Sequence, residues 1–130
     1  MPCTVTSDPS SRIVLVRYSG TMVPEETNEA RSKTAAELAL ARFRKVLIDL
    51  TEIERRSGFS IASLYRGGLS WSETMPRDVR VAVLYSPKTS GPRDVGFFET
   101  VATNRGVSMK TFQKMDEALA WLNSADADKA

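Results

Sequence analysis

The sequence predicts a single small α/β domain in which a mixed, mostly parallel five-stranded sheet packs against helices. Apolar segments of strand length alternate with helix-like segments, and such alternation requires crossover connections and a largely parallel sheet. The chain has 130 residues, of which 42% are hydrophobic, enough for one compact core without disulfides or metal. The expected order of elements is ββαβαβαβα.

The N-terminal segments 3–6 and 12–19 are expected to form an antiparallel hairpin that ends at Gly20, because residues 8–11 are the turn signal Asp-Pro-Ser-Ser. A helix is expected from Pro24 to about residue 43, since proline suits the first helical position and two glutamates follow it. Its apolar residues form two partial stripes, and either could face the sheet. The stripes are Ala36, Leu40 and Phe43, and Ala30, Leu38 and Ala41.

Segment 45–58 is the most informative part of the sequence, because it combines a buried strand with polar residues at its carboxyl end. Residues 46–50 form an apolar run interrupted only by Asp49, which is typical of a strand covered on both faces. The polar residues 51–56 are expected to form a turn, and Ser57 and Gly58 to begin the next helix. Open α/β sheets bind ligands at such strand ends, so candidate site residues are expected here.

The rest of the chain continues the same alternation. The helix after Ser57 is expected to be interrupted by Gly67 and Gly68 and to end at Pro76. A strand over 78–85, a helix over 92–105, a strand over 107–112 and a helix over 116–122 complete the prediction. Residues 124–130 are polar and small, so the folded domain is expected to span 1–123 and to be followed by a flexible tail.

Composition excludes several classes of function. The sequence has no histidine, so Ser-His-Asp and Cys-His mechanisms and the common histidine-bearing zinc sites cannot be built. Cys3 is the single cysteine, which rules out an intrachain disulfide. Neither of the two common glycine-rich phosphate-binding motifs occurs. No cofactor and no metal are therefore expected.

Charge and hydropathy bear on partners and location. The net charge is +2 and the pI is near 8.8, but the cations are scattered and no aromatic residues alternate with them, so no nucleic-acid partner is expected. The N-terminus lacks the basic and apolar stretches of a signal peptide, and no apolar run approaches the roughly 20 residues that span a bilayer. A cytoplasmic protein without a transmembrane segment is expected.

Asp49, Glu52 and Glu54 place three carboxylates at the end of the central strand. Such a cluster is able to serve acid/base chemistry or to bind a divalent cation. In a second interpretation, Asp49 and Thr51 form hydrogen bonds with the turn backbone while the two glutamates face water. The second interpretation is favoured, because Asp and Thr often bond to neighbouring backbone groups.

Four short segments resemble one known family. They are Val16-Arg17-Tyr18-Ser19-Gly20, residues 46–51, residues 80–84, and Phe112 followed by residues 116–122. Together with the order of elements, they make the chain similar to the SpoIIAA-like group of the STAS superfamily. The resemblance covers nearly the whole chain and implies the small α/β fold of that group, which sometimes resembles the lipid-binding CRAL-TRIO fold.

Sporulation-type STAS proteins carry an Asp-Ser-Ser-Gly motif after the central strand. A partner kinase that doubles as an anti-sigma factor phosphorylates the serine next to the glycine. The resemblance implies that Ser57 is the phosphoacceptor, although two arginines precede it and its hydroxyl also suits a helix N-cap. It further implies a non-enzymatic regulatory domain that binds a protein partner, either a kinase or an anti-sigma-like regulator. The residues expected to contact this partner are Asp49, Thr51, Arg55, Arg56, Ser57 and Gly58.

A small apolar, lipid-like ligand is the alternative partner. Several large apolar side chains lie on the predicted helices or in the loops beside them, and apolar clefts hold such ligands. They are Tyr65, Trp71, Met75, Phe97 and Phe98. Aromatic residues at helical spacing are also compatible with simple core packing. A homodimer is a further open alternative.

Overall fold

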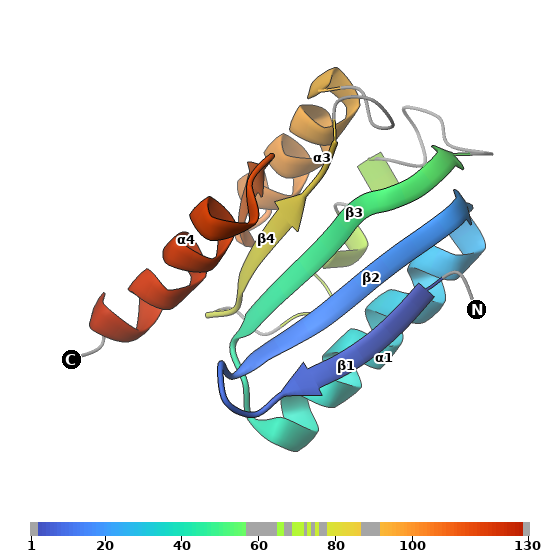
Figure 1. The fold of residues 1–130 in the computed structure, drawn as a ribbon. Helices are drawn as coiled ribbons and strands as arrows, with labels where there is room; N and C mark the ends of the chain where they lie inside the picture. The colour runs from blue at the N-terminus through green and yellow to red at the C-terminus, as the bar shows by residue number, and fades with distance from the viewer. Residues whose placement is uncertain are drawn as a thin grey trace.

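The computed structural model describes residues 3–56, 65–66, 69–71, 73, 75, 78–86 and 92–128 (Figure 1). The elements with defined bounds are β1 (Cys3–Asp8), β2 (Ile13–Met22), α1 (Pro24–Ala41), β3 (Lys45–Arg56), β4 (Arg80–Leu84), α3 (Pro92–Asn104), β5 (Ser108–Phe112) and α4 (Met115–Asp128). Tyr65, Arg66, residues 69–71 and Glu73 are also helical and lie within the helix predicted between β3 and β4. The order of elements therefore follows the predicted alternation.

The strands form one sheet in the order β1-β2-β3-β4-β5. β1 and β2 pair antiparallel, and every other neighbouring pair is parallel. The Arg12 N–H donates a 2.8 Å hydrogen bond to the Asp8 carbonyl and closes the hairpin. Ser10 and Ser11 donate hydrogen bonds to the Asp8 carboxylate, and these bonds lower its pKa. The predicted mixed, mostly parallel five-stranded sheet is confirmed.

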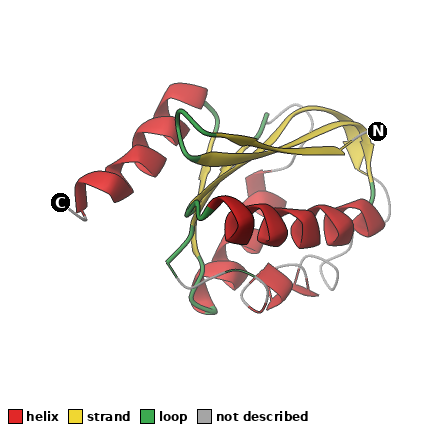
Figure 2. Cartoon of the chain, turned by 90° about the horizontal axis from the view of Figure 1, so that it is seen from below, coloured by secondary structure: helices red, strands yellow, loops and turns green. Residues whose placement is uncertain are grey.

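Helices cover the two faces of the sheet unequally (Figure 2). α1, α3 and the helical segment around Trp71 lie on one face, and the main core fills the space between them and the sheet. α4 lies on the other face, over β4 and β5. The core beneath it is smaller and consists of Ile13, Leu47, Ala82, Leu84, Ala118 and Leu122. The described helices leave most of the β1 and β2 part of this second face uncovered.

One of the two apolar stripes of α1 faces the sheet. Ala30 and Leu38 are 3% and 2% exposed, whereas Leu40 is 82% exposed. Thr34 lies between Ala30 and Leu38 on the buried side, and its hydroxyl donates a 2.7 Å hydrogen bond to the Ala30 carbonyl. This bond satisfies a polar group that would otherwise be costly to bury. The stripe that contains Ala30 and Leu38 therefore packs on the sheet.

β2 and β3 are longer than the sequence predicts. β2 continues past Gly20, and β3 continues through the whole of the expected turn 51–56. The two extensions pair with each other, with Gly20 opposite Ile53. Ile53 is 2% exposed and joins the main core, so it anchors the extension. The predicted turn and the predicted strand end at Gly20 are therefore wrong, because these polar residues mark a strand with one open face.

α4 also extends beyond its predicted end. It continues past Leu122 to Asp128. Arg80 of β4 links α4 to the sheet. The Nη1 of Arg80 donates hydrogen bonds to the Trp121 carbonyl at 2.9 Å and to Ser124 Oγ at 2.7 Å. The same guanidinium lies 5.1 Å from the centre of the Trp121 ring, within cation–π range. The division of the chain at residue 123 into a folded domain and a tail stays a prediction.

Candidate functional site

The site begins with an irregularity in the pairing of β2 with β3. Arg17 lies opposite Asp49, and the next paired residues are Ser19 and Glu52. One residue of β2 therefore faces two residues of β3, namely Leu50 and Thr51, which is the definition of a β-bulge. A bulge removes backbone groups from the ladder and redirects the neighbouring side chains.

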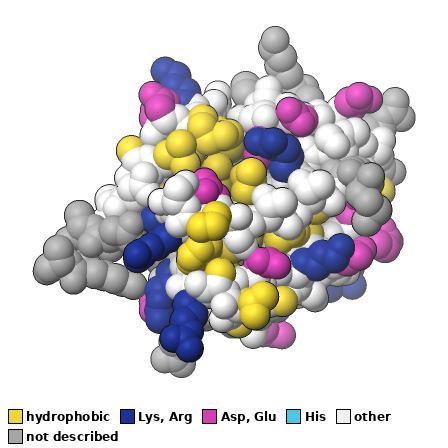
Figure 3. Space-filling view, turned by 60° about the horizontal axis from the view of Figure 1, so that its bottom comes forward, with side chains coloured by type: hydrophobic (Ala, Val, Ile, Leu, Met, Phe, Trp, Pro, Cys, Tyr) yellow, Lys and Arg dark blue, Asp and Glu magenta, His cyan; other side chains and the backbone are white. Residues whose placement is uncertain are grey.

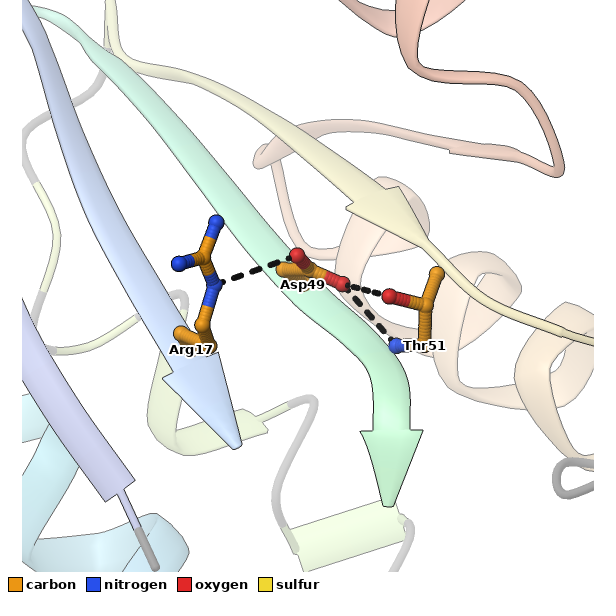
Figure 4. Close-up of polar contacts among 3 residues, drawn as sticks. All are labelled: Arg17, Asp49 and Thr51. Carbon is orange, nitrogen blue, oxygen red and sulfur yellow. Dashed lines mark hydrogen bonds and ion pairs between the residues drawn. The ribbon is translucent and has the colours of Figure 1, made fainter. Parts of the chain in front are cut away.

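The Asp49 side chain satisfies the backbone group at this bulge (Figure 4). Its Oδ1 accepts a 2.9 Å hydrogen bond from the Thr51 backbone N–H and a 2.6 Å hydrogen bond from the Thr51 hydroxyl. Its Oδ2 accepts a 3.3 Å hydrogen bond from Arg17 Nε on the neighbouring strand. The favoured interpretation, in which Asp49 and Thr51 bond to nearby backbone, is therefore the observed one, although the backbone belongs to a bulge rather than a turn.

Burial makes this arrangement energetically important. The side chain of Asp49 is 5% exposed and that of Arg17 is 44% exposed. A buried carboxylate is costly unless hydrogen bonds and an opposite charge compensate for lost water. Thr51 donates two hydrogen bonds to the Asp49 carboxylate, and Arg17 supplies the opposite charge. The cluster of Arg17, Asp49 and Thr51 therefore fixes the conformation of β3 where its carboxyl-terminal half begins.

The cluster lies at the border between the covered and uncovered parts of the second face. Arg17 is opposite Thr4 of β1, and Asp49 is opposite Leu84 of β4, which is buried beneath α4. Thr51, Glu52 and Glu54 are exposed. Figure 3 shows hydrophobic side chains in separate groups on one surface of the molecule, with charged and polar groups between them. The described residues include no group of three or more His, Cys, Asp or Glu side chains that could hold a metal ion.

The other predicted contact residues are only partly described. Arg55 and Arg56 end β3, so they lie on a strand rather than in a turn. Ser57 and Gly58 lie outside the described residues, and their predicted roles stay predictions. The structure thus joins Asp49 and Thr51 in one cluster, and β3 ends at Arg56, the residue before Ser57 in the sequence.

The residues proposed for an apolar ligand do not form one described group. Trp71 and Met75 are each 7% exposed and belong to the main core. Tyr65 is 42% exposed, and its hydroxyl accepts a 3.3 Å hydrogen bond from Arg105 Nη2. Phe97 is half-buried on α3, while the side chain of Phe98 lies outside the description. The ligand site stays a prediction.

Tyr18 and Cys3 form a polar pair that sequence reasoning did not identify. The two residues lie opposite each other on β2 and β1. Burial raises the pKa of the Tyr18 phenol and that of the Cys3 thiol. The hairpin register was the available signal, because it pairs the two positions. A raised thiol pKa means a poorly reactive cysteine.

No helix in the described ranges is long and apolar enough to cross a membrane. This finding agrees with the hydropathy of the sequence.

Comparisons with known proteins address the fold. No protein-family model and no curated protein sequence match this chain. Among solved structures, it is similar to an anti-sigma factor antagonist from Mycobacterium paratuberculosis, with a TM-score of 0.62 and 16% identity over 93% of this chain and 92% of the other.

A second solved structure is an uncharacterized protein of the DUF3478 family from Shewanella loihica, described as having a SpoIIAA-like fold. Its TM-score is 0.54, with 20% identity over 92% of this chain and 91% of the other. Both matches span nearly the full length of each chain. The protein is therefore a small α/β domain with the SpoIIAA-like fold, as the resemblance of its sequence implies.

Proposed function

We propose that this protein is a non-enzymatic regulatory domain that binds a protein partner through the carboxyl end of β3 and the residues that follow it. The supporting observation is the match over 93% of the chain with an anti-sigma factor antagonist, a protein named for its action on a regulatory protein. A histidine-free sequence whose single cysteine is half-buried with a raised pKa supports a binding role over a catalytic one.

The surface proposed to contact the partner is anchored by the cluster of Arg17, Asp49 and Thr51. The carboxyl ends of parallel strands are where open α/β sheets bind their ligands. The Asp49 hydrogen bonds hold the bulge in one conformation, so the strand end beyond it is presented in a fixed direction. A fixed surface binds a partner at a lower entropic cost than a mobile one.

Ser57 is the proposed switch of this surface. It directly follows Arg56, the last residue of β3. Phosphorylation would form a bond between the serine oxygen and the γ-phosphorus of ATP, break the phosphoanhydride, and release ADP and the hydroxyl proton. The modified serine would gain about 1.5 to 2 negative charges at neutral pH. Such a charge repels an acidic partner surface and is costly to bury against an apolar one, so we expect phosphorylation to release the partner.

The test compares the wild-type chain with variants in which Ser57 is replaced by a charged or an uncharged residue. Wild type and the Ser57→Asp and Ser57→Ala variants are used as baits in a lysate of the source organism, and a recovered protein is then purified. Its affinity for each chain is measured by isothermal titration calorimetry. We expect Ser57→Ala to bind like wild type and Ser57→Asp to bind at least tenfold more weakly.

Ser32→Asp is the matched control, because Ser32 is exposed on α1 and the substitution adds the same charge. It should bind like wild type. Equal affinities for Ser57→Asp and wild type would refute the switch while leaving the binding role intact. If none of the baits recovers a partner, the proposed function itself fails.

A further inference from the structure

The two outer edges of the sheet differ in how their backbone groups are satisfied. On β5, the Thr111 backbone N–H donates a 3.1 Å hydrogen bond to Glu99 Oε1, and the Met109 carbonyl lies 3.5 Å from the Thr103 hydroxyl. Glu99 and Thr103 are one turn apart on α3. Side chains of α3 therefore occupy the outer edge of β5 and close it to another strand.

The outer edge of β1 has no comparable protection in the described part of the chain. β1 is the outermost strand on its side of the sheet (Figure 1). Ser7 contacts Glu37 of α1 through its side chain, which leaves the outer backbone groups unaffected. The strand contains no proline, lysine or bulge, which are the usual devices that protect an edge, and its one charge, Asp8, lies at its end.

We propose that β1 pairs with β1 of a second copy of this chain, antiparallel and about a two-fold axis, so that one sheet runs through both molecules. Antiparallel self-pairing requires opposite residues to lie on the same face. The register that centres on Val5 places Val5 opposite its own counterpart, and Thr4 opposite Thr6 of the second copy. Threonine and valine are favourable cross-strand pairs, and no like charges meet in this register.

α1 fits beside its counterpart in the same arrangement. It contacts both β1 and β2, so it lies beneath the space between these strands. Neighbouring strands are about 4.8 Å apart, so the two α1 helices would lie roughly 10 Å apart, the usual spacing of packed helices.

The side of α1 towards β1 carries charges of both signs. Glu37 accepts a hydrogen bond from Ser7, and Lys33 lies close enough to Cys3 to affect its thiol electrostatically. In the proposed register Cys3 faces Ser7 of the second copy. Glu26 and Glu29 also act on the Cys3 thiol, and Glu29 forms a 3.3 Å ion pair with Lys33 of its own molecule, so this side of α1 meets its counterpart through charges of both signs.

Leu40 gives this surface an apolar component. It is 82% exposed, and it lies three residues beyond Glu37, so the two are neighbours on the surface of α1. A leucine this exposed has no role in the core of one molecule, whereas burial between two molecules would remove its apolar surface from water. One strand pair and one helix pair form a small interface, so we expect a dissociation constant on the order of micromolar.

The first experiment measures the dissociation constant of the wild-type dimer and of variants by analytical ultracentrifugation. Thr4→Lys combined with Thr6→Lys places lysines opposite each other, so dimerisation should weaken at least a hundredfold. Ser108→Lys is the matched control, because Ser108 is exposed on the other edge strand, and it should dimerise like wild type. Circular dichroism checks that all the chains are folded.

A second variant tests the helix contact without changing the strand. Leu40→Ser should raise the dissociation constant about tenfold, the amount expected for losing a buried leucine at an interface. Because Leu40 is exposed in one molecule, the variant should fold normally. A wild-type chain that is monomeric at millimolar concentration overturns the proposal, as does a lysine variant that dimerises like wild type.

Cross-linking tests the register. Thr4→Cys and Thr6→Cys chains are prepared separately, each with Cys3→Ser, and then oxidised with diamide, which takes up the two electrons and two protons of disulfide formation. Only the mixture of the two chains should form a covalent dimer, because residue 4 faces residue 6 of the other copy. Efficient cross-linking of either chain alone would overturn the proposed register.

Discussion

The best-determined residue of the candidate site, Asp49, shows what a sequence reveals about a single position. Its bond to Thr51 was predictable, because an aspartate two residues before a threonine commonly caps local backbone. Its bond to Arg17 was not, because those residues are 32 positions apart and only the pairing of β2 with β3 brings them together. The pairing of Cys3 with Tyr18 differs, because it lies within the predicted hairpin, whose register was the signal for it.

Asp49→Ala should lower the free energy of unfolding by about 2 to 4 kcal/mol, because it leaves the Thr51 N–H at the bulge without an acceptor. Thr51→Val removes only the hydroxyl bond and should cost about 1 kcal/mol. Urea denaturation monitored by circular dichroism measures both values. Glu52→Ala is the control, since its carboxylate is exposed, and it should stay within about 0.5 kcal/mol of wild type. Equal losses for Asp49→Ala and Glu52→Ala would contradict the assigned role.

The raised pKa of Tyr18 predicts that the protein becomes less stable at alkaline pH. The pKa of its phenol and that of the Cys3 thiol are raised by folding above the ordinary values of 10.0 and 9.0. A raised pKa favours the folded state below the unfolded value, so stability is constant below about pH 9 and falls as the pH rises further. Between its unfolded and folded pKa, each group lowers the free energy of unfolding by about 1.4 kcal/mol per pH unit.

Urea denaturation across this pH range should show a shallower fall above pH 10 for Tyr18→Phe than for wild type. Tyr65→Phe is the control, because Tyr65 is 42% exposed, and its pH profile should match that of wild type. Parallel profiles for wild type and Tyr18→Phe would show that this phenol does not set the dependence.

At the scale of elements, the prediction is wrong where a strand carries exposed polar residues, because such residues are also typical of turns. The sequence predicts a turn at 51–56 because these residues are polar, yet they continue β3 along a sheet face that the described helices leave open. Ile53, buried at 2% exposure, was the one signal in this segment for a longer strand. The helices and the buried strands were predicted more closely, because their apolar spacing directly reflects contact with the core.

The orientation of α1 gives an element-scale prediction. Leu38→Ala should lower the free energy of unfolding by about 3 kcal/mol, because it leaves a cavity between helix and sheet. Leu40→Ala is the same substitution on the exposed stripe and should change it by less than about 0.5 kcal/mol in dilute solution. Urea denaturation of both variants makes the comparison. A larger loss for Leu40→Ala would mean that the other stripe packs on the sheet.

For the whole molecule, the order of elements was sufficient to predict a mixed, mostly parallel sheet, but not the order of its strands. Crossover rules leave few arrangements for alternating strands and helices, so the parallel direction of strands β2, β3, β4 and β5 follows from the sequence. The unequal covering of its faces was not predictable, since it depends on where α4 lies. Arg80 contributes to that position through its contacts with Trp121 and Ser124, and Ala118 and Leu122 contribute through the core beneath α4; all of these contacts require the folded sheet.

The side chains that close the outer edge of β5 also limit how far the sheet can grow. In polymer terms, a sheet with two open edges is a bifunctional monomer, which adds strands at both ends without limit. In the part of the chain that the structure describes, Glu99 and Thr103 leave this molecule monofunctional. Coupling through β1 consumes the one open end, so a pair of molecules has none left, and the reaction terminates before a fibre can form.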